Sequence, residues 1–336
     1  MPDQITVLGA GSIGTYLGAR LHQGGASVRL IGRARYADAI RANGLTLSRF
    51  DEPPVILSDI DYRTDPSALS GSDTVALCVK SQDTTEAAQL VAAHAPNAHI
   101  VAFQNGVSNL PVLRERLANV SGAVVPFNVT SPAPGHFHQG TQGELLIGPT
   151  APDAMMAAFA ASGTPARVVD DIEGYLWAKL LVNLNNALNT LSGGPLRDGL
   201  LQHDYRRVLV AMIGEGMAVA KAEGVSPATF NGRSPAQLMR IMELPDWLYR
   251  IVMDRVVKID ATARSSMLDD LTLGRANELD YLQGEIVRRA ERLGIDVPVT
   301  RAVMAATSEA FAQKKSPRMS GATMRSRFTG GEARPT

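Results

Sequence analysis

The sequence has little cysteine, no excess of charge and no long apolar run, and each absence excludes a class of protein. Cys78 is the only cysteine among 336 residues, so no intramolecular disulfide can form, as expected for the reducing cytoplasm. Lysine plus arginine and aspartate plus glutamate number 33 each, so no net charge draws the chain to nucleic acid or a membrane surface. No run of about eighteen apolar residues occurs, and no signal-peptide pattern precedes the first predicted strand. We therefore expect a cytoplasmic protein that binds neither nucleic acid nor membrane.

The length and the order of the predicted elements indicate two domains. The hydrophobic content of 45% is sufficient for a sizeable core in each. Strand and helix patterns alternate up to residue 172, and only helical periodicity follows. We predict an α/β fold: an N-terminal doubly wound domain of Rossmann type over residues 1–172 and an all-helical domain over residues 173–315. Residues 316–336 are rich in Gly, Ser, Pro, Arg and Met, which predicts a disordered tail.

Three glycines between an apolar strand and a helical segment form the first informative motif. Residues 5–8 predict the strand, and the apolar residues that follow the glycines recur at helical intervals. Gly9 permits a tight turn, Gly11 lets the backbone approach a pyrophosphate, and Gly14 allows the helix to pack closely on the strand. The phosphate would lie at the positive end of the helix dipole. The predicted cofactor-binding residues of this turn are Gly9, Ala10, Gly11, Ser12, Ile13 and Gly14.

The residues after the second predicted strand, 27–31, indicate which nicotinamide cofactor fits. An acidic residue about twenty positions beyond the glycines would bind the ribose 2′-hydroxyl of NAD, whereas a basic one would accept the 2′-phosphate of NADP. Here Arg33 and Arg35 follow the strand, and no acidic residue occurs before Asp38. A guanidinium is always charged and matches phosphate geometry. We predict NADP(H) as cofactor, bound by Arg33 and Arg35, with a solvated basic loop as the alternative.

Lys80 and Asn105 follow the ends of two further buried strands, residues 73–79 and 100–103. Ligands of doubly wound sheets bind at the carboxyl ends of the strands, so both residues lie where a cofactor or substrate would bind. The alternative is a lysine in solvent and an ordinary Asn-Gly turn.

His136 and His138 could ligate a metal from an extended segment. No cysteine or third histidine lies nearby in the sequence. We therefore predict no metal site.

The predicted helical segment over residues 175–188 is apolar on nearly every side but contains Lys179 and Asn183. An unpaired lysine in apolar surroundings is costly, so Lys179 should face a cavity or a partner charge. Asn183 lies four residues later, on the same face. A lysine that donates a proton and an amide that orients the substrate suit ketone reduction. The alternative is a lysine whose charged end reaches solvent. Further along, the Ser266 hydroxyl could bind a substrate carboxylate. Glu278 could support the site or bind the substrate, and the alternative is a glutamate in solvent.

These segments together resemble the ketopantoate reductase family, the 2-dehydropantoate 2-reductases, over nearly the whole chain except the tail. The resemblance implies that Lys179 protonates the carbonyl oxygen as general acid while NADPH delivers hydride to the ketone of 2-dehydropantoate, a step of pantothenate and coenzyme A biosynthesis. It also implies that Glu278 acts at the active site near the lysine and substrate, that Asn183 and Ser266 bind substrate, and that Lys80 and Asn105 line the cofactor and substrate cleft. Lys80 is expected to bind the cofactor, and Asn105 both cofactor and substrate. The matching motifs are residues 9–14, 79–81, 104–106, 179–183, 265–270 and 278–281.

Two departures from the family pattern concern the substrate. Ala187 stands where some members have a second substrate-contacting asparagine, and residues 260–264 lack an asparagine that some members carry. The alternatives are therefore a reductase of another 2-keto or 3-keto acid and a non-catalytic NADPH-binding sensor. Helical domains of this apolar content often form dimers, so a homodimer is an open expectation.

Overall fold

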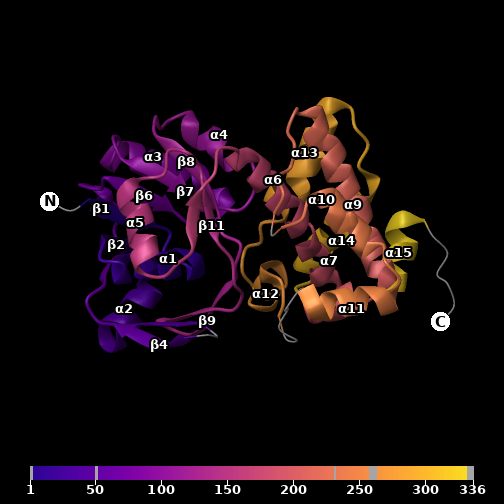
Figure 1. Cartoon of the computed structure of the whole chain (residues 1–336), viewed down its shortest axis with the longest axis horizontal. Helices are drawn as coiled ribbons and strands as arrows, with labels where there is room; N and C mark the ends of the chain where they lie inside the picture. The colour runs from indigo at the N-terminus through magenta and orange to yellow at the C-terminus, as the bar shows by residue number, and fades with distance from the viewer. Residues whose placement is uncertain (1–2, 50–51, 231, 257–262, 331–336) are drawn as a thin grey trace. The chain divides into compact units, whose positions relative to one another are not determined.

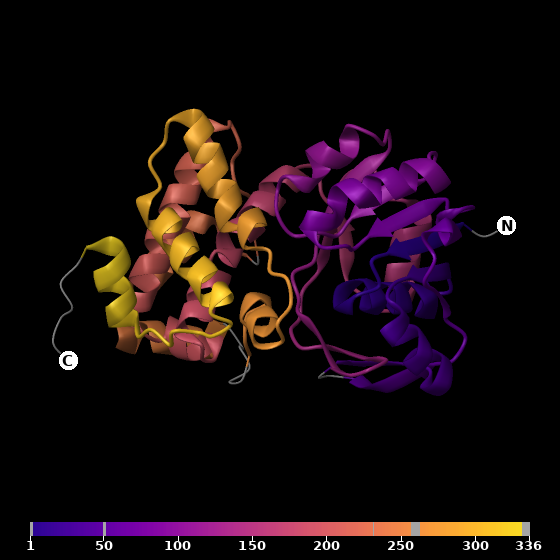
Figure 2. The same ribbon diagram turned by 180° about the vertical axis from the view of Figure 1, so that it is seen from behind.

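A computed structural model describes residues 3–49, 52–230, 232–256 and 263–330 of the chain (Figure 1). The chain folds into two compact units, Met1–Ile172 and Glu173–Thr336. Figure 2 shows both from behind. Among the described helices, none combines the length and the apolar character needed to cross a membrane.

The first unit is built on an eight-stranded sheet with the order β12-β11-β8-β7-β6-β1-β2-β5. The pairs from β8 through β5 are parallel, and β11 is antiparallel to β8. Apolar runs form the central strands because these strands are covered on both faces. The predicted Rossmann-type α/β unit is therefore confirmed. The strands are β1 (Gln4–Leu8), β2 (Ser27–Ile31), β5 (Asp61–Arg63), β6 (Thr74–Leu77), β7 (His99–Ala102), β8 (Val120–Val124), β11 (Leu145–Ile147) and β12 (Ala166–Val168).

Helices cover this sheet, and α1 packs on β1 and β2. An added Cβ at Gly18 of α1 would lie 2.3 Å from Cδ2 of Leu30 in β2, so any larger residue would displace this buried side chain. The neighbouring Leu17 and Leu21 are fully buried in the core. The helices of this unit are α1 (Ser12–Gln23), α2 (Ala34–Asn43), η1 (Pro66–Leu69), η2 (Ser81–Asp83), α3 (Thr84–His94), α4 (Asn109–Arg114) and α5 (Asp153–Ala161).

A second, four-stranded sheet has the order β4-β3-β10-β9. Its strands are β3 (Leu45–Arg49), β4 (Glu52–Leu57), β9 (Val129–Ala133) and β10 (His136–Gln139). The apolar pattern over residues 122–130 predicts a single strand. That prediction is wrong, because β8 ends at Val124 and β9 begins at Val129. Pro126 lies in the gap and has no N–H for a sheet hydrogen bond.

The second unit is helical, as predicted. Its helices are α6 (Ile172–Asn183), α7 (Asn185–Ser192), α8 (Leu196–Leu200), α9 (His203–Ala222), α10 (Pro235–Met242), α11 (Asp246–Val256), α12 (Ser266–Thr272), η3 (Leu279–Tyr281), α13 (Gln283–Leu293), α14 (Pro298–Ala312) and α15 (Gly321–Thr329).

Helical periodicity over residues 235–258 predicts one long helix. The structure has two helices there, and residues 257 and 258 lie outside the described residues. α10 and α11 are separated at Pro245, which cannot continue a helix from the preceding turn. The fully buried Arg206 binds the carbonyl oxygens at this break, at 2.8 Å for Met242 and 2.7 Å for Leu244. The break is therefore a fixed feature of the fold.

The prediction of a disordered tail is wrong for the described residues 316–330. α15 lies beside α9, with Met324 and Phe328 buried (Figure 1). Gln202 accepts the backbone N–H of Gly321 at 2.8 Å. Two apolar side chains four residues apart bury enough surface to order a segment whose composition alone indicates disorder. Residues 331–336 of the predicted tail lie outside the described residues.

Candidate active site

The glycine turn between β1 and α1 has two crowded glycines and one that faces open space. Gly9 has φ +98°, and a Cβ there would lie 2.5 Å from the backbone nitrogen of Val79. A Cβ on Gly14 would lie 2.3 Å from the carbonyl oxygen of Gly9. A Cβ on Gly11 would have no described heavy atom outside its immediate chain neighbours within 4 Å. Gly9 and Gly14 thus serve the packing of the turn, whereas Gly11 leaves room for a ligand.

The N-terminus of α1 is suited to an anion at the same place. No side chain of the described chain caps this helix, whose N-cap residue is Gly11. The N–H groups of a first helical turn have no partner within the helix, and they carry the positive end of its dipole. The open space at Gly11 and the uncapped helix therefore fit the pyrophosphate of a dinucleotide.

The predicted phosphate-binding residues Arg33 and Arg35 are both exposed at the start of α2. Arg35 lies over the ring of Tyr36 at 4.6 Å and donates to its hydroxyl at 3.0 Å. The Tyr62 hydroxyl donates to the backbone carbonyl of Arg33 at 3.2 Å. Burial raises the pKa of Tyr62 to about 12, so this hydroxyl stays protonated and can hold the loop. No pattern in the short segment of β5 indicated this role for Tyr62.

The loops that carry Lys80 and Asn105 are joined by buried polar side chains. The Ser81 hydroxyl donates to the backbone carbonyl of Asn105 at 3.0 Å, and the Asn109 amide donates to the same carbonyl at 2.7 Å. Gln104 donates to the backbone of the first loop, at the carbonyl of Val79, at 3.1 Å. The structure thus brings together the two strand ends that the sequence predicted as a ligand-binding edge. The supporting residues Ser81, Gln104 and Asn109 were not predicted.

In the helical unit, Lys179 of α6 interacts with Glu278, which immediately precedes η3. Both side chains are half-buried. Burial lowers the pKa of Lys179 to about 8, and the negative charge of Glu278 partly opposes that shift. Asn183 lies one helical turn after the lysine and is also half-buried. A lysine whose pKa lies near neutrality can donate a proton during a reaction.

Two adjacent serines at the start of α12 have different surroundings in the structure. Ser265 is buried, and its hydroxyl accepts the backbone N–H of Leu268 at 3.2 Å as the N-cap of the helix. Ser266 is exposed, so its hydroxyl can contact a ligand. Asn189 of α7 accepts the backbone N–H of Ser265 at 2.9 Å. Asn189 was not predicted, because a buried amide has no distinguishing signal in the sequence.

The two histidines of β10 hydrogen-bond to one serine. The Ser48 hydroxyl lies 2.7 Å from Nε2 of His136 and 2.8 Å from Nδ1 of His138. Within the described part of the chain, no group of three or more metal-ligating side chains converges.

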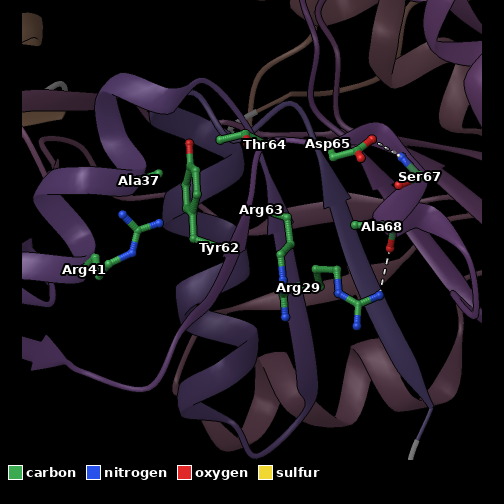
Figure 3. A pocket seen from close by; sticks show the side chains of 9 residues that line it. All are labelled: Arg29, Ala37, Arg41, Tyr62, Arg63, Thr64, Asp65, Ser67 and Ala68. Carbon is green, nitrogen blue, oxygen red and sulfur yellow. Dashed lines mark hydrogen bonds between the residues drawn. The ribbon is translucent and has the colours of Figure 1, made fainter.

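A cavity of about 550 Å³ lies beside the edge strand β5 (Figure 3). Asp61 binds Arg29 at 2.9 Å and Arg63 at 2.5 Å, and Arg41 is paired with Asp38 at 3.0 Å. The arginines that line the cavity therefore already have carboxylate partners. None of the predicted site residues lines this cavity, and we do not assign it to the candidate site. Its lining residues are Arg29, Ala37, Arg41, Tyr62, Arg63, Thr64, Asp65, Ser67 and Ala68.

A Rossmann-type unit with a glycine turn, followed by a helical unit that carries a lysine with a lowered pKa, fits the class of two-unit oxidoreductases. Comparison with known families gives the particular assignment. The family model described as "Ketopantoate reductase PanE/ApbA" matches residues 5–152, and the family model for its C-terminal domain matches residues 171–310. The chain belongs to the ketopantoate reductase family.

Individual relatives agree with this assignment. A 2-dehydropantoate 2-reductase of Halobacterium salinarum is 31% identical over 310 residues, which cover 89% of this chain and 95% of the relative. The crystal structure of a PanE/ApbA family ketopantoate reductase from Ralstonia eutropha has a TM-score of 0.77 at 35% identity, covering 93% of this chain and 99% of that one. A D-mandelate dehydrogenase in a ternary structure with NADH and anilino(oxo)acetate has a TM-score of 0.78 at 19% identity, covering 93% and 99%. The last similarity concerns the fold alone.

Proposed function

We propose that the protein catalyses the NADPH-dependent reduction of 2-dehydropantoate to pantoate. The observation that carries the proposal is Lys179, a half-buried lysine with its pKa lowered to about 8 beside Glu278, in a chain that matches both family models. Asn183 shares its helix face, which gives the site an orienting amide next to the proton donor.

NADPH, when bound, supplies the hydride for the carbonyl carbon of the keto acid. Side chains of the protein donate the proton and orient the substrate. The Nζ of Lys179 donates a proton to the carbonyl oxygen as negative charge develops there. Asn183, Ser266 and Asn105 hold the substrate so that the reacting carbonyl is oriented, which supplies part of the rate. Glu278 favours the protonated form of the lysine.

The residues of the first unit bind the cofactor in this proposal. Gly11 and the first turn of α1 take the pyrophosphate, and Lys80 and Asn105 lie along the cofactor. The guanidinium groups of Arg33 and Arg35 take the 2′-phosphate. The remaining proposed cofactor contacts are Gly9, Ala10, Ser12, Ile13 and Gly14.

The test is NADPH oxidation by the purified protein with 2-dehydropantoate, beside a panel of other 2-keto and 3-keto acids, and again with NADH. We expect the highest kcat/KM for 2-dehydropantoate with NADPH.

Arg33→Ala should raise the KM for NADPH and leave the KM for NADH unchanged, because NADH has no 2′-phosphate. Arg41→Ala is the matched control, since Arg41 is exposed on the same helix and paired with Asp38 at 3.0 Å.

A second candidate function is reduction of a different keto acid on the same fold. Ala187 favours it, because this fully buried methyl side chain replaces the amide of some family members. A higher kcat/KM with another acid of the panel would establish this candidate. Tight NADPH binding without turnover of any acid would instead indicate a sensor.

The proposal also includes a cytoplasmic location and a homodimer. Light scattering on the purified protein tests the second part, and a monomer at micromolar concentration would contradict it.

A further inference from the structure

The buried amide of Asn189 links two elements that carry proposed substrate-binding residues. Asn189 lies on α7, directly after the α6 helix of Lys179 and Asn183, and has no exposed surface. Its Oδ1 accepts the backbone N–H of Ser265 at 2.9 Å. Its Nδ2 donates to the carbonyl of Gly194 at 2.9 Å. Both ends of the amide are therefore used, and one of them reaches the residue before α12.

Ser265, whose N–H donates to Asn189, is the N-cap residue of α12. Ser265 has an extended backbone, with φ −72° and ψ 151°, and its hydroxyl caps the helix at Leu268. It is 3% exposed, whereas the next residue, Ser266, is exposed as the first residue of the helix. Because Ser266 follows directly, the backbone of Ser265 sets the direction in which the Ser266 hydroxyl is presented.

We propose that Asn189 is a positioning residue for the keto acid, acting through Ser266. The inference rests on the proposed function, in which Ser266 binds the substrate. A buried backbone N–H needs a partner, so replacing the amide by an apolar side chain leaves the Ser265 N–H unpaired and displaces the start of α12. A small displacement of an orienting group is sufficient to weaken substrate binding.

The first experiment compares Asn189→Leu with Thr190→Val. Thr190 is the neighbouring fully buried residue of α7, and its hydroxyl donates within its own helix, to the carbonyl of Asn186 at 2.9 Å. Both variants remove a buried hydrogen bond, so both should lower the Tm. Only Asn189→Leu should raise the KM for the keto acid, by about tenfold, with kcat and the KM for NADPH within about twofold of wild type. An equal rise in Thr190→Val would overturn the inference, because it would reflect general loosening of α7.

The second experiment adds Ser266→Ala alone and in combination. If Asn189 acts through Ser266, Asn189→Leu should raise the KM little further once the hydroxyl is absent. An undiminished tenfold rise in the Ser266→Ala background would overturn the inference. If Asn189→Leu does not fold, Asn189→Ser removes the same amide with less disturbance, and the same comparison applies.

The two proposals fail in different ways. An unchanged KM in Ser266→Ala would contradict the substrate role of Ser266, and the inference about Asn189 would fall with it. A raised KM in Ser266→Ala with an unchanged KM in Asn189→Leu would overturn the inference about Asn189 and leave the proposed function intact.

Discussion

Lys179 can be identified as a candidate from the sequence, but its pKa depends on the surroundings that the fold gives it. Its position among apolar residues of α6 predicted a partner charge or a cavity. In the structure the partner charge is Glu278, 99 positions later in the sequence. No local pattern pairs these two residues, and only the family resemblance implied that Glu278 acts beside the lysine. Burial and this charge act on the pKa in opposite directions, and burial has the larger effect.

The pH dependence of turnover should report this lysine. A general acid must be protonated, and the pKa of Lys179 is lowered to about 8. The kcat for keto-acid reduction should therefore be constant below about pH 7 and fall about tenfold per pH unit well above 8. The measurement is kcat at saturating substrate and NADPH between pH 5.5 and 10.

Two variants give the controls for this profile. Glu278→Gln removes a charge that raises the lysine pKa, so the fall in kcat should begin at a lower pH. Lys179→Ala should reduce kcat by about 10² to 10⁴-fold and abolish this bend. A bend that stays in place in both variants would assign the titration to another group.

At the scale of elements, the glycine turn predicts opposite outcomes for two similar substitutions. Gly11→Ala adds a methyl group that meets no described neighbouring atom within 4 Å, so the Tm should be unchanged. The affinity for NADPH should fall, because the methyl group would occupy the place of the pyrophosphate. Gly14→Ala places a Cβ 2.3 Å from the carbonyl of Gly9, so the turn itself should be destabilised. Measurement of the Tm and titration with NADPH, each on both variants, test these two predictions. Normal NADPH affinity in Gly11→Ala would show that the cofactor does not approach this residue.

The helix α15 gives a test of whether the chain beyond residue 315 contributes to stability. Met324 is fully buried, so Met324→Ala should lower the free energy of unfolding by about 2 to 4 kcal/mol. Ser326→Ala, at an exposed position of the same helix, should change it by less than about 0.5 kcal/mol. Denaturant unfolding of both variants is the measurement, and equal stabilities would mean that α15 does not pack on the unit in solution.

The elements predicted correctly are those with a strong local pattern. β1, the glycine turn and α1 follow from apolar periodicity and glycine spacing, and the structure contains them as predicted. The errors occur where long-range packing decides. Pro245 divides a predicted helix whose break is held by the distant Arg206, and α15 is ordered by burial on α9. Asn189 and Tyr62 were missed for the same reason, since their partners lie far away in the sequence.

On the scale of the whole molecule, the proposed chemistry divides between the two units. The glycine turn, Arg33 and Arg35 belong to Met1–Ile172, whereas Lys179 and Ser266 belong to Glu173–Thr336. Each unit contains its own supporting polar contacts, such as Gln104 in the first and Asn189 in the second. NADPH should therefore protect the first unit, whereas the keto acid should protect the helical unit in addition to the loop of Asn105.

Amide hydrogen exchange tests this division directly. A bound ligand slows exchange where it restricts local opening, so NADPH alone should protect residues 9–14 and 32–36. Adding the keto acid to the complex with NADP⁺, which cannot deliver hydride, should extend protection to residues 179–183 and 265–268. Thermal unfolding should shift upward with each ligand by mass action. Protection by the keto acid confined to residues 1–172 would contradict the assignment of substrate binding to the helical unit, and the roles of Lys179, Asn183 and Ser266 would then need reassignment.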